Sequence, residues 1–450
     1  MGLAAENKIE KKNAGKYYTP DDVATIMAQY LLELPGDNIC DLCCGTGNLI
    51  FAVLNELGEE KAKEKIANGN IYLYDIDETA INICLAILKN RYGDIISNIH
   101  IILGNCLDSS ITFPNNAKII SNPPYGKNNT LASSQFASAK RTKELYVAFM
   151  EKALISNLPM VFITPHSFLG GSTFKELRAE LIGGKIFSFD NVPGNIFKGK
   201  KFGIFNSNEA NSTRAAISIL NPNEENLYIS PFIRFRSEER SKILNKDYLD
   251  SLLPIVPQKQ DGTILYRIAN GTEEITNKWL SYKKTFGSLL TTKSEYKLDI
   301  PNTCRYFTTA SKRTLNRSGK MTVYCKDEQS FYLAYAFINS SLCYYWHRMC
   351  NGGITYPITL LKEMPIFGEV SPELKNYCDT MIANEEQYIV LKKNAGAYQE
   401  NIKFPMEDRF QLTELLLEQI DLHNNLSLKK VHNNSCLTTG IDNFNDDEEE

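Results

Sequence analysis

The chain has 450 residues, 43% of them apolar and 23% charged, which is enough for a large core and for two or three domains. No apolar run approaches the ~20 residues that a membrane helix needs, which excludes a membrane-spanning class, and we expect a cytoplasmic chain. The formal net charge is −4, but the last nine residues, "DNFNDDEEE", carry six acids, and removing those six charges leaves +2. We therefore expect a disordered acidic tail over 431–450, and contacts with a polyanion that depend on local basic patches.

Residues 36–220 alternate short apolar runs with helix-like stretches, a pattern typical of a parallel sheet covered by helices. The predicted strands are "NICDL" (38–42), "IYLYD" (71–75), "IHIIL" (99–103), "AKIIS" (117–121), "MVFIT" (160–164), "KIFSFD" (185–190) and "AAISIL" (215–220). Amphipathic helices are predicted over 77–92 and 144–156. The pattern indicates an α/β, doubly wound, seven-stranded domain of the Rossmann-like kind, and such sheets bind ligands at the carboxyl ends of their strands.

The alternation of strands and helices is lost from about residue 225. The sequence predicts strands and irregular segments up to about residue 330. It then predicts a helix, a loop containing Gly-Gly and Pro, and two further helices, over 331–349, 351–366, 371–393 and 407–430. We therefore expect a C-terminal mixed α+β domain. The predicted divisions are a tail (1–14), a first domain (15–224), a second domain (225–430) and the acidic tail (431–450).

A glycine turn follows the first predicted strand in "DLCCGTGNLI" (41–50). An acid at the strand end and a G-T-G that opens a helix let backbone amides approach a ligand closely. Cys40 and Cys43 form a C-x-x-C, but no second pair has zinc spacing, so we expect reduced thiols and no metal site.

The second predicted strand ends in "LYDID" (73–77), where a carboxylate can accept hydrogen bonds from ribose hydroxyls. Asp75 is the first candidate for this contact, and Asp77 is an alternative. The third glycine of the G-x-G-x-x-G dinucleotide fingerprint is missing, because position 50 is Ile. The sequence therefore favours a nucleoside ligand without phosphates.

The fourth predicted strand ends in Asn122-Pro123-Pro124-Tyr125, again at the ligand edge. The prolines fix φ and remove two N–H donors, so the local carbonyls can accept hydrogen bonds without competition. With the Asn122 side chain they make a rigid acceptor pair that suits an exocyclic NH2 group. Tyr125 offers a ring on which a planar base can stack. The alternative, a simple turn, fits the position at the sheet edge less well.

These motifs and their order resemble the gamma class of N6-adenine DNA methyltransferases, which are TaqI-like amino-group enzymes with an N-P-P-Y motif that use S-adenosylmethionine. In that class a T-P element precedes the glycine motif, and "GKYYTPDDVATIMAQYLL" (15–32) carries Thr19 and Pro20 there. The resemblance covers residues 15–220 well and the remainder in outline. It implies an AdoMet-binding catalytic domain over 15–224 and a DNA target-recognition domain over 225–430.

The resemblance also implies a set of cofactor-binding residues. Thr19, Asp41 and Gly45 would line the methionine end of S-adenosylmethionine, Asp75 would hold the ribose, and "LGNCLD" (103–108) would touch the adenine. The family usually has Asp where this chain has Asn105, and often an aromatic residue where it has Cys106. The complete predicted cofactor set is Thr19, Pro20, Asp41, Cys43, Gly45, Gly47, Asp75, Asn105, Cys106 and Asn122.

The loop "DNVPGNIFKGKKFGIFN" (190–206) corresponds to the family segment whose aromatic residue stacks on the far face of the flipped base. Phe197 is the predicted stacking residue, opposite Tyr125, and Phe202 and Phe205 are alternatives. The predicted DNA contacts combine lysines of this loop with bases of the window 305–326, in which Tyr306, Phe307 and Tyr324 are interleaved. These contacts are Lys198, Lys200, Lys201, Arg305, Lys312, Arg313, Arg317 and Lys320.

The resemblance predicts a site-specific DNA adenine-N6 methyltransferase, acting as the modification component of a restriction-modification or related defence system. Its expected partners are double-stranded DNA and a separate restriction endonuclease, and the expected state is a monomer with no membrane contact. N4-cytosine in DNA, a protein glutamine and an RNA guanine present the same planar NH2 and stay open as substrates. A catalytically silent DNA-binding specificity subunit is the alternative without activity.

Overall fold

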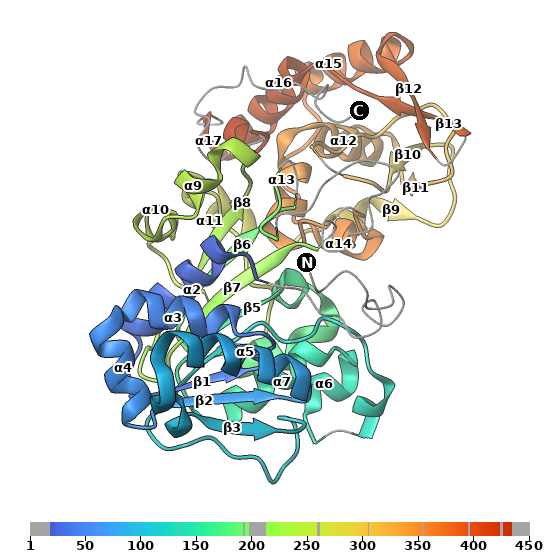
Figure 1. Ribbon diagram of the computed structural model, residues 1–450. Coiled ribbons are helices and arrows are strands. Elements are labelled where there is room, and N and C mark those ends of the chain that lie inside the picture. Colours follow the sequence, from blue (N-terminus) through green and yellow to red (C-terminus); the bar gives the residue numbers. More distant parts are fainter. Residues whose placement is uncertain are drawn as a thin grey trace. The chain divides into compact units, whose positions relative to one another are not determined.

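The computed structural model describes residues 19–133, 135–191, 194–197, 213–258, 262–304, 306–353, 355–394, 397–423 and 426–433. The chain divides into two compact units, Met1–Tyr266 and Arg267–Glu450, called unit 1 and unit 2 below (Figure 1). Within these described ranges, no helix is long and apolar enough to cross a membrane.

Unit 1 is built on one eight-stranded sheet in the order β3-β2-β1-β4-β5-β7-β6-β8. The strands are β1 (Asn38–Leu42), β2 (Ile71–Asp75), β3 (His100–Leu103), β4 (Ala117–Ser121), β5 (Met160–Pro165), β6 (Gly184–Phe189), β7 (Ala215–Leu220) and β8 (Leu227–Ile233). Neighbouring strands are parallel, except that β7 runs antiparallel to both β5 and β6. The predicted doubly wound α/β fold is confirmed, and its seven predicted strands agree with β1–β7 to within about one residue at each end.

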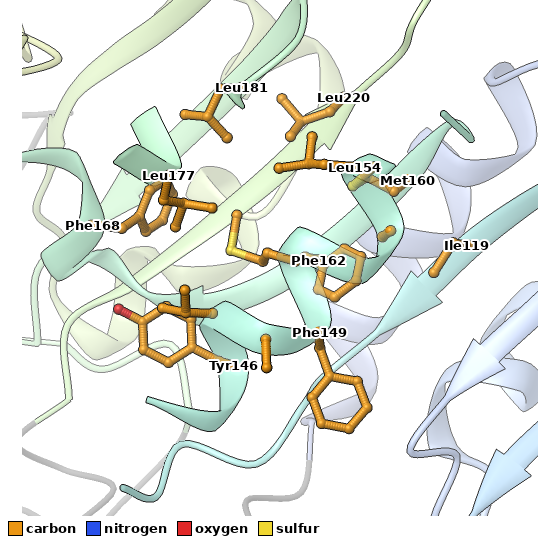
Figure 2. Packing of buried hydrophobic residues seen from close by; sticks show 14 of the residues in the cluster. Ile119, Tyr146, Phe149, Leu154, Met160, Phe162, Phe168, Leu177, Leu181 and Leu220 are labelled. Carbon is orange, nitrogen blue, oxygen red and sulfur yellow. The ribbon is translucent and has the colours of Figure 1, made fainter. Parts of the chain in front are cut away.

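The central strands β4 and β7 are buried along their whole length, as expected where helices cover both faces of a sheet. The helices of unit 1 are α2 (Asp21–Glu33), α3 (Asn48–Leu57), α4 (Glu59–Ala67), α5 (Glu78–Tyr92), α6 (Ala137–Thr142), α7 (Leu145–Ile155), α8 (Lys175–Glu180), α9 (Arg240–Ile243) and α10 (Lys246–Ser251). On one face, α7 and α8 pack with β4, β5 and β7 into the apolar cluster of Figure 2, which includes Tyr146, Phe162 and Leu177. This cluster supports the strands whose carboxyl ends carry the predicted site.

The sheet extends beyond the predicted first domain. The eighth strand, β8, follows residue 224 and pairs in parallel with β6, across a register shift between Ile186 and Ser188. β8 contains Pro231, which has no N–H to donate and is tolerated because β8 is an edge strand. Residues 225–266 therefore pack with unit 1, and the compact units divide after Tyr266 instead of at the predicted 224/225.

Unit 2 combines helices with a three-stranded sheet, β10-β11-β9, and a separate hairpin, β12–β13. Its elements are α11 (Glu273–Leu280), β9 (Leu290–Thr291), β10 (Lys297–Pro301), β11 (Lys320–Cys325), α12 (Glu328–Asn339), α13 (Ser341–Cys350), α14 (Ile358–Glu363), α15 (Pro372–Ala383), β12 (Ile389–Asn394), β13 (Ala397–Ile402), α16 (Met406–Leu417) and α17 (Leu426–Lys430). The predicted helix over 331–349 is two helices, because the side chain of Ser340 caps α13 by accepting from the Leu342 amide at 3.2 Å. The helix predicted over 371–393 ends at Ala383, and β12 follows it.

Candidate active site

The glycine turn between β1 and α3 adopts the backbone that its residues permit. Gly45 and Gly47 have φ values of 52° and 96°, and Cys43 has a positive φ of 65°, which is unusual for a residue other than Gly. A Cβ at position 47 would lie 2.6 Å from the Cys84 sulfur, so glycine is required there. The Gly45 amide donates to the Asp75 carboxylate at 2.7 Å. The turn is therefore tied to the end of β2 by a hydrogen bond.

Asp41 is the penultimate residue of β1, and its carboxyl group is fully buried. Neither carboxyl oxygen has a hydrogen-bond partner among the described residues. Burial, followed by the neighbouring charge of Asp75, raises the pKa of Asp41 to about 8, and the nearby Ile50 amide, which does not meet the geometry of a hydrogen bond, lowers it in part. An uncompensated buried carboxyl of this kind fits a cationic group, whose approach would favour the ionised form.

The geometry distinguishes Asp75 from its alternative, Asp77. The Asp77 carboxylate caps α5 by accepting from the Ala80 amide at 3.1 Å. Asp75 stands at the end of β2, where its carboxylate accepts from the amides of Gly45 and Asp77 at 2.7 and 2.9 Å. These two amides fix the Asp75 carboxylate beside the glycine turn, so Asp75 is the better placed of the two acids to meet a ligand there.

Ile76 is a residue of this edge that the sequence reasoning missed. Its side chain is 72% exposed, directly after Asp75 at the carboxyl end of β2. A large apolar side chain exposed beside a polar ligand edge can cover one face of a planar ring. The available signal was an apolar residue between two acids at a strand end, in "DID".

The loop after β3 holds its two predicted residues differently. Asn105 is exposed, and its side chain accepts from the Leu107 amide at 3.1 Å and donates to Asp108 at 3.0 Å. Cys106 is 4% exposed, and burial raises the pKa of its thiol to about 11. The Lys152 ammonium donates to the Asp108 carbonyl at 2.8 Å and so ties this loop to α7. Asn105 is thus the accessible member of the pair.

Asn122 and Thr19 are 103 residues apart in sequence and meet at the end of β4. The Asn122 amide nitrogen donates to the Thr19 hydroxyl at 3.0 Å, so the amide presents its oxygen on the other side. Thr19 is 3% exposed, and its carbonyl accepts from the Asn48 side chain at 3.1 Å, in the first turn of α3. The T-P element, the glycine turn and the N-P-P-Y motif are therefore joined by side-chain hydrogen bonds. Pro20 lies beside Thr19, at the N-terminal end of α2.

The rings of Tyr125 and Phe197 lie together, with centroids 5.9 Å apart and planes at 67°. The Tyr125 hydroxyl donates to the Ile163 carbonyl at 3.1 Å, which fixes that ring on the sheet. A base held between two parallel rings needs about 7 Å, because carbon atoms in contact are about 3.5 Å apart. A base can therefore enter only when one ring turns, and Tyr125 is the anchored one. Pro123 is buried, and Pro124 is partly exposed beside Tyr125.

The predicted basic residues of unit 2 divide into engaged and exposed groups. The Lys320 ammonium lies 2.6 Å from the buried carboxylate of Asp299. The Arg317 guanidinium donates to the Gly319 carbonyl at 3.0 Å and to the Asn401 side chain. Both groups hold unit 2 together and give no support to a phosphate contact. Their neighbour Lys312 is exposed, whereas Arg313 is half-buried and its guanidinium lies 3.8 Å from the Glu386 carboxylate.

Several predicted residues lie outside the described part of the chain, and their roles stay predictions. They are Lys198, Lys200, Lys201, Phe202, Phe205 and Arg305. In the part that the structure describes, no group of three or more His, Cys, Asp or Glu residues could hold a metal ion.

Comparison with known proteins gives matches over part of the chain. Residues 3–183 match the family model described as N-6 DNA Methylase. Type II methyltransferase M.VspI of Vibrio sp. (strain 343) is 29% identical over 198 residues, which is 42% of this chain and 46% of that protein. The Type I restriction enzyme MpnII methylase subunit of Mycoplasma pneumoniae is 26% identical over 151 residues, 28% of this chain and 26% of that protein. The chain therefore spans less than half the length of either relative.

Among solved structures, the DrdV–DNA complex aligns with a TM-score of 0.45 and 17% identity, over 65% of this chain and 37% of that chain. The predicted resemblance to N6-adenine DNA methyltransferases is confirmed over residues 3–183 by the family model and the two relatives. The narrower gamma-class, TaqI-like assignment stays a prediction.

Proposed function

We propose that this chain, whose N-terminal part matches the N-6 DNA methylases, transfers a methyl group from S-adenosylmethionine to the N6 amino group of adenine in duplex DNA. The observation that carries the proposal is the 3.0 Å hydrogen bond from the Asn122 amide to the Thr19 hydroxyl. It joins the acceptor motif to the element that precedes the glycine turn. The acceptor oxygen of Asn122 then stands at the same sheet edge as Asp41 and Asp75.

The residues at this edge fit S-adenosylmethionine, which when bound supplies a methyl group on a sulfonium. Asp41, a buried carboxyl without a hydrogen-bond partner among the described residues, would compensate positive charge at the methionine end, next to Thr19 and Gly45. Asp75 would accept from the ribose hydroxyls. Asn105 and Ile76 would meet the adenine of the cofactor, one by hydrogen bonding and the other by apolar contact.

The chain contributes to the chemistry mainly by orienting the target amino group. The lone pair of that nitrogen is delocalised into the base, so the group is a poor nucleophile. The Asn122 oxygen and the Pro123 carbonyl would each accept a hydrogen bond from one N–H of the amino group. These two hydrogen bonds localise the lone pair on nitrogen. The same acceptors stabilise the positive charge that develops on nitrogen as it attacks. Because both come from one rigid turn, they need little reorganisation during the reaction.

The target base must leave the duplex to reach this turn. Tyr125, anchored by its hydroxyl, would hold one face of the flipped base, and Phe197 would turn to hold the other. Stacking on two rings offsets part of the cost of unstacking.

We assign DNA target recognition to the part of the predicted second domain that lies in unit 2, residues 267–430, and within it the β12–β13 hairpin supports the assignment best (Figure 1). Leu391 and Tyr398 are 61% and 66% exposed there, although both are large apolar residues. Lys392 and Lys393 are exposed beside them. A two-stranded ribbon fits the major groove of DNA, where lysines meet phosphates and an aromatic residue can contact bases.

The proposal includes a biological setting, in which the chain is the modification component of a restriction-modification system, acts as a monomer and works beside a separate endonuclease. The test is transfer of a labelled methyl group to duplex DNA, compared with protein and ribosomal RNA acceptors. Methylation-sensitive sequencing of DNA from expressing cells then identifies the base and the site. Label in protein or RNA instead of DNA would contradict the proposal. Label at cytosine N4 would show that the target base is cytosine instead of adenine.

A further inference from the structure

The loop that carries Phe197 is closed at its base by a buried ion-pair cluster. Asp190 follows β6, and its carboxylate lies 3.0 Å from the Arg214 guanidinium, which precedes β7. Arg234, at the end of β8, donates to the same carboxylate at 2.9 and 3.1 Å. All three side chains are at most 9% exposed. The described ends of the loop are therefore tied together across the sheet edge.

The turn just before Phe197 is fixed by its own backbone contacts. The Gly194 amide donates to the Phe235 carbonyl at 2.7 Å. A Cβ at position 194 would lie 2.5 Å from that carbonyl oxygen, so only glycine allows this approach. The Asn195 side chain accepts from the Phe197 amide at 2.8 Å.

Arg240, at the start of α9, donates hydrogen bonds from its guanidinium both to this turn and to α2. Its Nη1 and Nη2 donate to the carbonyls of Asn195 and Ile196, each at 2.7 Å. Its Nε and Nη2 donate to the two carboxylate oxygens of Asp22, at 2.6 and 2.9 Å. Asp22 lies in the first turn of α2, three residues after Thr19. One side chain thus joins the backbone beside Phe197 to the helix that follows the T-P element.

We infer that Arg240 is a positioning residue that holds the backbone at Asn195–Ile196, so that Phe197 closes on the flipped base by side-chain rotation alone. The inference rests on the proposed function. With the two carbonyls fixed, the Phe197 ring can turn away from its edge contact with Tyr125 while its Cα stays in place. Arginine suits this task because its planar guanidinium makes four hydrogen bonds here, two to the carboxylate and one to each carbonyl, whereas a lysine ammonium has three donors.

The test compares Arg240→Met, which keeps the aliphatic stem, with a matched control, Lys246→Met. Lys246 joins α10 to the other end of α2 through Glu33, at 2.8 Å, and also pairs with Asp250 at 3.0 Å, and neither partner belongs to the loop that carries Phe197. We expect Arg240→Met to lower kcat for DNA methylation about tenfold, the range of a weakened base–aromatic stack, with KM for DNA changed much less. Lys246→Met should stay within about twofold of wild type, because its partly exposed ion pairs join α10 to the end of α2 that is remote from Thr19.

A double-mutant cycle with Phe197→Ala shows whether Arg240 acts through Phe197. In the Phe197→Ala background, Arg240→Met should lower kcat by less than about twofold, since the ring that it positions is gone. Equal losses of kcat in both backgrounds would overturn the inference. A loss of S-adenosylmethionine affinity equal to the loss of kcat would also overturn the inference, because the substitution would then act through Thr19 and the cofactor instead of through Phe197. A wild-type protein that methylates no DNA would instead overturn the proposed function itself.

Discussion

The buried carboxyl of Asp41 makes the stability of the protein depend on pH in a way that one substitution should remove. In the folded chain the pKa of Asp41 is raised to about 8, because burial and the nearby Asp75 disfavour its charge. In the unfolded chain the pKa returns to its ordinary value of 3.8. Between these values the folded state holds a proton that the unfolded state releases. The contribution of Asp41 to stability therefore falls as pH rises from about 4 to about 8 and is constant above that range.

The magnitude follows from the linkage of about 1.36 kcal/mol per pH unit. Between pH 5 and pH 7, which both lie inside the window, wild type should lose about 2.7 kcal/mol through Asp41. The side chain that Asp41→Asn introduces has no proton to release. The free energy of unfolding of the variant minus that of wild type should therefore rise by about 2.7 kcal/mol between pH 5 and pH 7. Asp94→Asn, which removes a carboxylate whose side chain is 99% exposed, is the matched control.

The assay is urea unfolding followed by far-ultraviolet circular dichroism at pH 5, 6 and 7. Fluorescence reports unit 2 separately, because both tryptophans of the chain, Trp279 and Trp346, lie there. Saturating S-adenosylmethionine should flatten the pH dependence of wild type, since its positive charge would favour ionised Asp41. A stability difference between Asp41→Asn and wild type that is the same at pH 5 and pH 7 would refute the reasoning.

Two further predictions test the base-binding ring and the hairpin of unit 2. Tyr125→Ala should lower the rate of methyl transfer about 5- to 150-fold, the range for loss of one base–aromatic stack. Tyr125→Phe keeps the ring and loses the hydroxyl's hydrogen bond to the Ile163 carbonyl, so its effect should be about fivefold at most. Equal losses in the two variants would argue against stacking. Changing Lys392 and Lys393 to Gln should weaken DNA binding and reduce the slope of log K against log salt by about 1 for each phosphate that a lysine no longer neutralises, in filter-binding titrations. Lys375→Gln, which removes a lysine of α15 that is paired with Glu328, is the control, and an equal change of slope there would contradict the role of the hairpin.

Much of unit 1 could be predicted because its central strands are buried on both faces and stand out as continuous apolar runs. The edge strand β8 was not predicted, since Pro231 interrupts its pattern and the domain boundary was placed before it. In unit 2, the helix break at Ser340 depends on a local cap inside an otherwise continuous apolar stretch. The hairpin β12–β13 is formed by a segment whose first half was assigned to a helix.

The contacts of the site differ in the same way. Asn122, Asp75 and Gly45 could be named from sequence because each lies at the end of a predicted strand or just after it, at the ligand edge. Arg240 could not, since its carboxylate partner Asp22 is 218 residues away and nothing in the local sequence marks the pair. The angle between the rings of Tyr125 and Phe197 is likewise a tertiary property, which their residue types do not determine.

The proposed mechanism depends most on the Asn122 oxygen as an acceptor for the target amino group. The most direct measurement is kcat for labelled methyl transfer to duplex DNA by Asn122→Ala, with Thr19→Val as the control. Thr19→Val removes the hydroxyl that accepts from the Asn122 amide at 3.0 Å and keeps the Asn122 acceptor oxygen itself. We predict that Asn122→Ala lowers kcat by about 100-fold or more while DNA binding survives, and that Thr19→Val retains much more of the activity. Unchanged turnover in Asn122→Ala would contradict the mechanism.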